Sequence, residues 1–216
     1  MGATGSCLSA VDLSGVGYRC ASSSDCAPGL ICQTSVCASQ GGGAPWDGGP
    51  LVDAGSTWRY LDDGTDLGTA WREPDFNDSS WASARSAIGY GATKLETEIP
   101  ASDGGHYTTY FRFAWMMTRV PLGDLLVRVR RDDGAAVYIN GLEVFRTNLK
   151  EDGGTIVSTT PATTHISLTV DEERYVEGRV AASSLVQGRN VVAVEVHQPD
   201  LGGHDMAFDL ELRAAP

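Results

Sequence analysis

The sequence predicts an all-β protein: an antiparallel jelly-roll β-sandwich preceded by a small N-terminal disulfide-stapled segment. After about residue 57, segments of strand length alternate apolar and polar residues or are apolar throughout, which is typical of strands that bury one or both faces. In no segment of comparable length do apolar residues recur with the period of a helix, except for one helical turn expected within 180–188. All five cysteines lie before residue 38, so any staples belong to the N-terminal segment alone.

The cysteines are Cys7, Cys20, Cys26, Cys32 and Cys37, and the last four have the spacing C-x5-C-x5-C-x4-C. Residues 1–38 hold too few large apolar residues to fold unaided, so two disulfides are expected. Zinc is the alternative, but zinc ligands usually come in closer cysteine pairs, and this segment has no histidine. Cys7 is a free thiol, a link to another chain, or a residue whose partner lies upstream. Disulfides predict a secreted protein, extracellular or at a cell surface.

Residues 39–55 are rich in Gly and Pro and are predicted to be a linker, which leaves 56–216 as the main domain. Strands are expected at 107–117, 124–131, 135–139, 142–146, 165–170, 190–198 and 206–213. Asn140-Gly141 lies between two of these strands and predicts a type I′ hairpin turn, which requires positive φ at both central residues. The long polar segments 62–84 and 92–106 are loops of the kind that carry function or an ion.

Charge and hydropathy exclude two classes of partner. The chain has 16 Lys and Arg against 28 Asp and Glu, for a formal net charge of −12 and a pI near 4.6. Nucleic-acid binding rests on clustered basic residues that displace counterions, so no nucleic-acid partner is expected. No apolar run approaches the roughly 20 residues of a membrane-spanning helix, so no membrane span is expected either.

Several segments of the main domain resemble a known family. They are "STWRYLDDGTDLGTAWREPDFNDSSWASARSAIGYG", "TTYFRFAW", "VRRDDGAAVYINGLEVFRTN", "GRNVVAVEVHQ" and "DMAFDLEL". Together they resemble the galactose-binding-domain-like β-sandwich, the jelly roll shared by discoidin-type domains and many carbohydrate-binding modules. The resemblance covers about residues 56–213. It implies a non-catalytic accessory module, often with one structural calcium ion. The cysteine-rich stretch is similar to small extracellular segments in which the first cysteine pairs with the third and the second with the fourth, which implies Cys20–Cys32 and Cys26–Cys37.

A calcium site is expected on the first long loop, because Ca²⁺ takes six to eight oxygen ligands from irregular loops. In relatives, a carboxylate from the last strand often joins the loop ligands, here Asp209 or Glu211. The predicted metal ligands are Asp62, Asp63, Asp66, Asp75, Asn77, Asp78 and Asp209. The alternative is that these acids solvate a surface loop and that Asp75 and Asp78 close Asx turns.

The stretch "RDDG" begins at Arg131 and places two aspartates before a strand. One aspartate can accept backbone N–H bonds in the turn. Successive residues of an extended chain face opposite sides, so the other is free to face a cleft. Sugar-binding relatives hold ligand hydroxyls with a few Asp, Asn, Arg or His groups beside an aromatic ring. The candidate ligand-binding residues are Tyr90, His106, Tyr107, Arg131, Asp132, Asp133, His197 and His204.

These observations favour a secreted, bacterial, carbohydrate-binding module that recognises a free or cell-surface glycan. The alternative is a structural or adhesive surface domain that binds another protein or its own copies. An enzyme is disfavoured, because no G-x-S-x-G elbow or α/β alternation appears. A retaining glycosidase needs two carboxylates about 5 Å apart, and the sequence selects no such pair. His197 and Glu195 alternate on one strand and share a face, either as a metal or proton site or as a hydrogen-bonded patch.

Overall fold

The structure is a computed structural model that describes residues 22, 30–33, 36–39, 49–101, 105–150, 154–167, 169–203 and 205–215. The chain divides into two compact units, Met1–Pro45 and Trp46–Pro216. In the first unit, β1 (Leu30–Gln33) and β2 (Val36–Ser39) pair antiparallel, with Cys32 opposite Cys37. Cys7, Cys20 and Cys26 lie outside the described residues, and only the backbone is described for the other two. The disulfides therefore stay a prediction.

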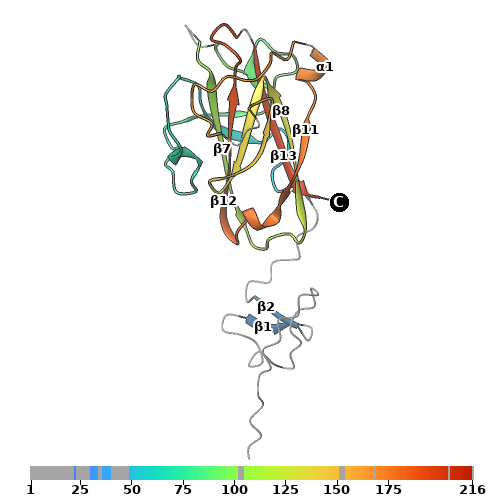
Figure 1. Cartoon of the computed structure of the whole chain (residues 1–216). Coiled ribbons are helices and arrows are strands. Elements are labelled where there is room, and N and C mark those ends of the chain that lie inside the picture. The colour runs from blue at the N-terminus through green and yellow to red at the C-terminus, as the bar shows by residue number, and fades with distance from the viewer. Residues whose placement is uncertain are drawn as a thin grey trace, which may run out of the picture. The chain divides into compact units, whose positions relative to one another are not determined.

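The second unit contains two sheets that face each other (Figure 1). The six-stranded sheet has the order β10-β9-β12-β7-β3-β4. Its strands are β3 (Thr57–Leu61), β4 (Ala82–Arg85), β7 (Thr108–Met117), β9 (Gly134–Ile139), β10 (Leu142–Thr147) and β12 (Gly188–His197). The five-stranded sheet has the order β11-β8-β13-β5-β6. Its strands are β5 (Ile88–Tyr90), β6 (Thr97–Glu98), β8 (Asp124–Asp132), β11 (Val176–Ala181) and β13 (Met206–Ala214). All pairs are antiparallel except β5 with β6.

Helical structure is short. In the part of the chain that the structure describes, it comprises α1 (Thr169–Glu172) and two 3₁₀ turns, η2 (Ala70–Arg72) and η3 (Ala182–Ser184). The turn expected within 180–188 corresponds to η3. No helix in the described part of the chain is long and apolar enough to cross a membrane.

Aromatic side chains join the two sheets across the main core. The Phe208 ring of β13 stacks on the Phe111 ring of β7, with 4.0 Å between ring centroids. Trp58 of β3 meets Phe208 edge-on, with 4.9 Å between centroids. All three side chains are fully buried, and burying each contributes about 1.5–3 kcal/mol. The predicted all-β sandwich is therefore confirmed for the second unit.

A second apolar cluster covers the outer face of the six-stranded sheet. It contains Trp71, Trp81, Tyr110, Ala136, Tyr138, Leu149, Ile156 and Ala193. Trp71 lies in η2, within the long polar segment 62–84, and its ring meets Tyr110 at 4.7 Å. The segment 62–84 is therefore more than a surface loop. It covers the outer face of the six-stranded sheet, which the alternation of apolar and polar residues along the strands would predict to be exposed to solvent.

Two local predictions have opposite outcomes. The hairpin is confirmed: Ile139 pairs with Leu142, and φ is +51° at Asn140 and +86° at Gly141. The strand expected at 165–170 is wrong, because residues 165–167 have no strand partner and α1 begins at Thr169. The reason is a contact between residues distant in sequence, since the Ile166 N–H that a neighbouring strand would bind donates instead to the Asp133 carboxylate.

Candidate ligand-binding and cation site

The candidate site lies where the chain leaves β8 and enters β9 in the other sheet. Asp132 ends β8 and Gly134 begins β9. A Cβ atom at Gly134 would lie 2.8 Å from the Asn148 backbone oxygen, so the position needs glycine. Arg131, Asp132 and Asp133 are buried, with exposures of 9 %, 0 % and 2 %. The "RDDG" stretch therefore carries three charged side chains into one end of the sandwich.

Asp133 organises the segment that follows β10. Its carboxylate accepts the Ile166 N–H at 2.5 Å, and its backbone oxygen accepts Asn148 Nδ2 at 3.2 Å. Asn148 Nδ2 also donates to the Thr164 oxygen at 2.7 Å, and Thr164 Oγ1 donates to Asn148 Oδ1 at 2.9 Å. The position of the 164–166 segment is thus fixed by two side chains from the strand ends.

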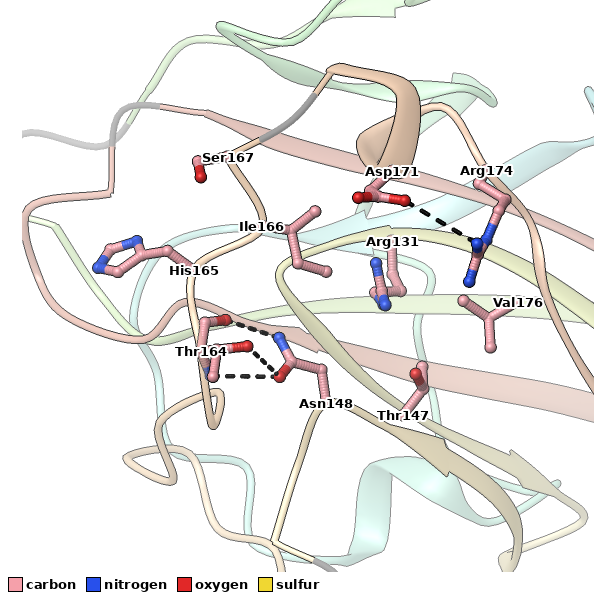
Figure 2. Close-up of a pocket in the computed structure, with 10 residues that line it drawn as sticks. All are labelled: Arg131, Thr147, Asn148, Thr164, His165, Ile166, Ser167, Asp171, Arg174 and Val176. Atoms are coloured by element: carbon pink, nitrogen blue, oxygen red, sulfur yellow. Dashed lines mark hydrogen bonds and ion pairs between the residues drawn. The ribbon is translucent and has the colours of Figure 1, made fainter.

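A cavity of about 530 Å³ opens beside this network (Figure 2). Arg131 lies between the Asn148–Thr164 contacts and the Asp171–Arg174 pair, whose charged atoms are 3.9 Å apart. The lining residues are Arg131, Thr147, Asn148, Thr164, His165, Ile166, Ser167, Asp171, Arg174 and Val176. They offer hydrogen-bond donors and acceptors of both charge signs and the imidazole ring of His165, but no Phe, Tyr or Trp side chain.

An acidic group lies beside the cavity. One oxygen each from Asp132, Glu172 and Asp205 lies within 4.8 Å of the others. Within the described ranges, no other three His, Cys, Asp or Glu side chains are gathered in this way. Burial first, and then repulsion from Asp133, Asp205 and Glu172, raises the pKa of Asp132 to about 8. The arrangement is one that could hold a metal ion.

Tyr90 shares this acidic environment. It pairs with Met206 in the register of β5 and β13, one residue from Asp205. Burial, followed by the negative charges of Asp62, Asp205 and Asp132, raises the pKa of Tyr90 to about 12. Four of the eight predicted ligand-binding residues, Tyr90, Arg131, Asp132 and Asp133, therefore lie at this one end of the domain.

His106 and Tyr107 line a different, smaller cavity of about 210 Å³, with Gly64, Thr65 and Leu201 among its walls. His106 Nε2 lies 2.7 Å from Asp62 Oδ1, which also accepts Thr109 Oγ1 at 2.6 Å. His204 lies outside the described residues. The structure thus does not place these histidines in the cavity around Arg131.

His197 is fully buried and is not among the residues that line the two cavities described above. Its Nδ1 lies 2.7 Å from the Thr160 oxygen, and its Nε2 lies 3.4 Å from Glu195 Oε2. Glu195 Oε1 accepts Arg72 Nη2 at 2.9 Å and the Tyr138 hydroxyl at 2.6 Å. Of the two roles open to this pair, the hydrogen-bonded patch fits these contacts.

Three of the residues predicted as calcium ligands cap turns of the first long loop. Asp63 accepts the Thr65 N–H at 2.9 Å, Asp66 accepts the Gly68 N–H at 3.0 Å, and Asn77 accepts the Ser79 N–H at 3.1 Å. Each closes an Asx turn, whereas the alternative assigned such turns to Asp75 and Asp78. Asp75 is exposed on a neighbouring turn.

Asp78 and Asp209 have other partners. Asp78 Oδ2 accepts Arg112 Nε at 2.9 Å. Asp209 accepts the Gly55 N–H at 3.1 Å, the Ser86 hydroxyl at 2.5 Å and the Tyr175 hydroxyl at 2.5 Å. The predicted loop ligands are therefore spread over separate hydrogen-bonded sites rather than gathered around one point.

Sequence reasoning missed several residues of the site, notably Glu172 and Asp205. A signal existed for Asp205, because it directly precedes the last strand. That strand pairs antiparallel with β8, with Ala207 opposite Asp132, which brings the two acids to the same end. No pattern marks Glu172, which reaches the site through the short helix α1.

Comparison with known proteins gives limited likeness. No family model matches the sequence, and no curated protein is similar to it. Similar solved structures include a β-glucuronidase 2 from Bacteroides uniformis (17 % identity, TM-score 0.46) and a β-glycosidase from Bacteroides vulgatus (16 % identity, TM-score 0.41). They also include a β-glucuronidase from Ruminococcus gnavus (10 % identity, TM-score 0.43).

These comparisons cover 78 %, 73 % and 75 % of this chain and 18 %, 19 % and 29 % of those chains, respectively. The chain therefore spans less than a third of the length of each. At these identities and TM-scores, the likeness assigns this chain no activity, substrate or ligand.

Proposed function

We propose that residues 56–216 form a non-catalytic carbohydrate-binding module of a secreted protein, which binds its ligand in the cavity around Arg131. The observation that carries the proposal is the cavity of about 530 Å³ with a polar lining held on strand ends. Sugar hydroxyls both donate and accept hydrogen bonds, so they need a lining that offers both. The Thr147 and Thr164 hydroxyls, Asp171 and Arg174 provide that mixture.

The apolar part of the lining suits a small sugar surface. Ile166 and Val176 face the cavity among the polar groups (Figure 2), and the C–H face of a pyranose can lie against such aliphatic side chains. Binding would rest on hydrogen bonds more than on ring stacking, because the described lining includes the imidazole of His165 but no Phe, Tyr or Trp side chain. The family resemblance of the sequence supports the same ligand class.

The burial of the acidic group supports a non-catalytic role. The three carboxylate oxygens lie close enough together to suggest the carboxylate pair of a retaining glycosidase. Such a pair must touch the glycosidic bond. Asp132 is 0 % exposed and Glu172 is 7 % exposed, so neither side chain is open to a polysaccharide.

The edges of the sheets favour a binding module over a self-assembling domain. Long, flat, apolar edge strands template association between copies, whereas short edges resist it. The edge strands β4 and β6 have 4 and 2 residues, and the opposite edge strands, β10 and β11, have 6 residues each and carry the charged residues Glu143, Arg146, Glu177 and Arg179. The most exposed large apolar side chains, Leu122 and Met116, are aliphatic and come from a loop and from β7.

Secretion and a structural calcium ion belong to the same proposal. Clustered cysteines in the first 37 residues support an oxidising compartment. Oxygen-only ligands suit calcium, and the group formed by Asp132, Glu172 and Asp205 offers them. The acids of the first long loop support the ion less, because their oxygens cap turns.

The test is glycan binding by the full chain and by two arginine variants. Arg174→Ala removes an exposed cavity arginine, and Arg179→Ala removes an exposed arginine of β11 outside the cavity. We expect wild type to bind a subset of a glycan panel, and Arg174→Ala to bind it at least about tenfold more weakly, as loss of one charged hydrogen bond predicts. Arg179→Ala should bind like wild type.

Three results would contradict the proposal. Equal loss in both variants would place the ligand elsewhere. Binding to no glycan in the panel at millimolar concentration, together with concentration-dependent association in sedimentation, would favour the assembly function instead. Release of sugar from a bound glycan would show that the module is an enzyme.

A further inference from the structure

Asp132 is a buried carboxyl group that the described residues leave without a partner. Its side chain is 0 % exposed, and neither carboxylate oxygen has a hydrogen-bond partner in the described part of the chain. An ionised carboxylate in such a place costs several kcal/mol unless a counter-charge or a metal ion binds it. Glu172 and Asp205 add acidic oxygens within 4.8 Å, which increases the repulsion.

The nearest arginines make no hydrogen bond to the carboxylates of this group. Arg130 donates from Nε to the Glu172 backbone oxygen at 2.9 Å, and from Nη1 and Nη2 to the oxygens of Lys94 and Thr93 at 3.0 and 2.5 Å. All three nitrogens of its guanidinium therefore bind carbonyl groups. Arg131 Nε and Nη1 have no partner. Within the described ranges, no ion pair joins a basic side chain to Asp132, Glu172 or Asp205.

The oxygen chemistry selects a hard divalent cation. Carboxylates without nitrogen or sulfur ligands suit Ca²⁺, Mg²⁺ or Mn²⁺ rather than Zn²⁺. Gln198, 4 % exposed, supports the group from behind, since its Nε2 donates to the backbone oxygens of Asp132 at 3.2 Å and Asp205 at 3.0 Å. Outer groups that orient the ligands are a general feature of metal sites.

The three acids come from segments that also form the cavity. Asp132 lies between Arg131, which lines the cavity, and Asp133, whose carboxylate holds Ile166. Glu172 follows Asp171 at the end of α1, and Asp171 forms the cavity wall with Arg174 (Figure 2). Fixing Glu172 against Asp132 therefore fixes the wall that carries Asp171.

We propose that Asp132, Glu172 and Asp205 bind a calcium ion that holds the α1 segment against the end of β8, so that the ion forms one wall of the cavity and controls ligand binding there. The proximity of the Asp132, Glu172 and Asp205 carboxylates supports the binding of the ion and the ordering of α1. Control of carbohydrate binding rests on the proposed function.

The first experiment measures the ion directly, in the full chain under non-reducing conditions after chelator treatment. Calcium titration by calorimetry and a thermal melt with calcium or chelator should show one site and a higher melting temperature. At a calcium concentration a hundredfold above Kd, the stabilisation corresponds to about 2.7 kcal/mol, or about 5 °C or more for a domain of this size. Magnesium at the same concentration tests the choice of ion.

Variants at two ends of β8 make the test specific. Asp132→Asn should lose the calcium response, and Asp124→Asn, at the exposed start of the same strand, should keep it. A melt in chelator separates misfolding of Asp132→Asn from loss of a calcium ligand. In chelator, Asp132→Asn should melt no lower than wild type, since an amide of equal size replaces an unpartnered carboxylate. In calcium, wild type should melt at a higher temperature than Asp132→Asn.

Each half of the proposal can fail by itself. A calcium response that survives in Asp132→Asn, or that disappears in Asp66→Asn, would overturn the site. Hydrogen exchange with and without calcium reports on the wall, and unchanged protection of residues 164–176 would overturn the ordering of α1. If the ion binds and the wall orders but no glycan binds, the proposed function fails while this site stands.

Discussion

Buried charges in this domain are stable where they have a partner of opposite sign or several carbonyl groups. Arg112 is 1 % exposed, and its guanidinium bonds the Asp78 carboxylate and the backbone oxygens of Trp71 and Glu73. Arg72 bonds Glu195 in the same way and also lies over the Tyr138 ring, 4.1 Å from its centroid. Asp132 differs from these examples, because neither of its carboxylate oxygens has a hydrogen-bond partner among the described residues.

Glu195 provides a residue-scale prediction about pH. Burial alone would raise its pKa, but the His197, Tyr138 and Arg72 groups outweigh burial and hold the pKa below its usual value of 4.5. Protonation of this carboxyl is then harder in the folded state than in the unfolded state. Its stabilising contribution is therefore present above pH 4.5 and is lost as the pH falls through the lower, folded-state pKa.

Glu195→Gln should cost about 3–5 kcal/mol at pH 7, because it leaves Arg72 buried without its counter-charge. The difference in unfolding free energy between wild type and this variant should shrink as the pH falls below 4.5. Urea denaturation from pH 3 to pH 7 measures both. Glu177→Gln removes an exposed acid from β11 and should cost less than about 1 kcal/mol. A difference that grows at low pH would contradict the sign worked out above.

At the scale of single elements, strands with their own pattern were predictable and elements fixed by distant contacts were not. The Asn140-Gly141 hairpin was predictable because its turn chemistry is local. The 165–170 segment alternates like a strand, yet a side chain 33 residues away takes its Ile166 N–H. The "RDDG" stretch identified part of the site through its acid pair. Glu172 could not be found, because only the tertiary fold brings α1 to the end of β8.

Gly89 provides an element-scale prediction in β5. A Cβ atom there would lie 1.8 Å from the Met206 backbone oxygen, so β5 can approach β13 this closely only with glycine. Gly89→Ala should lower the unfolding free energy by about 3 kcal/mol or more, since the clash is with backbone. Gly123→Ala is the matched control: its φ is +88° and nothing lies within 4 Å, so it should cost about 1 kcal/mol from backbone strain alone. Chemical denaturation compares the two, and equal losses would show that the close approach is not required.

At the scale of the whole molecule, the two units differ in what stabilises them. Successive strands β7, β8 and β9 alternate between the two sheets of the second unit, so their connections gather at the ends of a sandwich with one continuous apolar core. That core contains no cysteine, because all five precede residue 38. The first unit has a short hairpin and the predicted disulfides. Stability should therefore respond to reductant in one unit and not in the other.

Calorimetry of the full chain with and without reductant tests this division. We expect a main transition with an enthalpy of about 120 kcal/mol near 60 °C, as a domain the size of Trp46–Pro216 should give. Its midpoint should move by less than about 2 °C on reduction, because nothing in the unit that produces it can be reduced to thiol. Thiol counting on the denatured chain should rise from one to five if two disulfides leave Cys7 free. A main transition that falls with reductant would mean that folding of the sandwich depends on the cysteine-rich unit, and that the two units unfold as one.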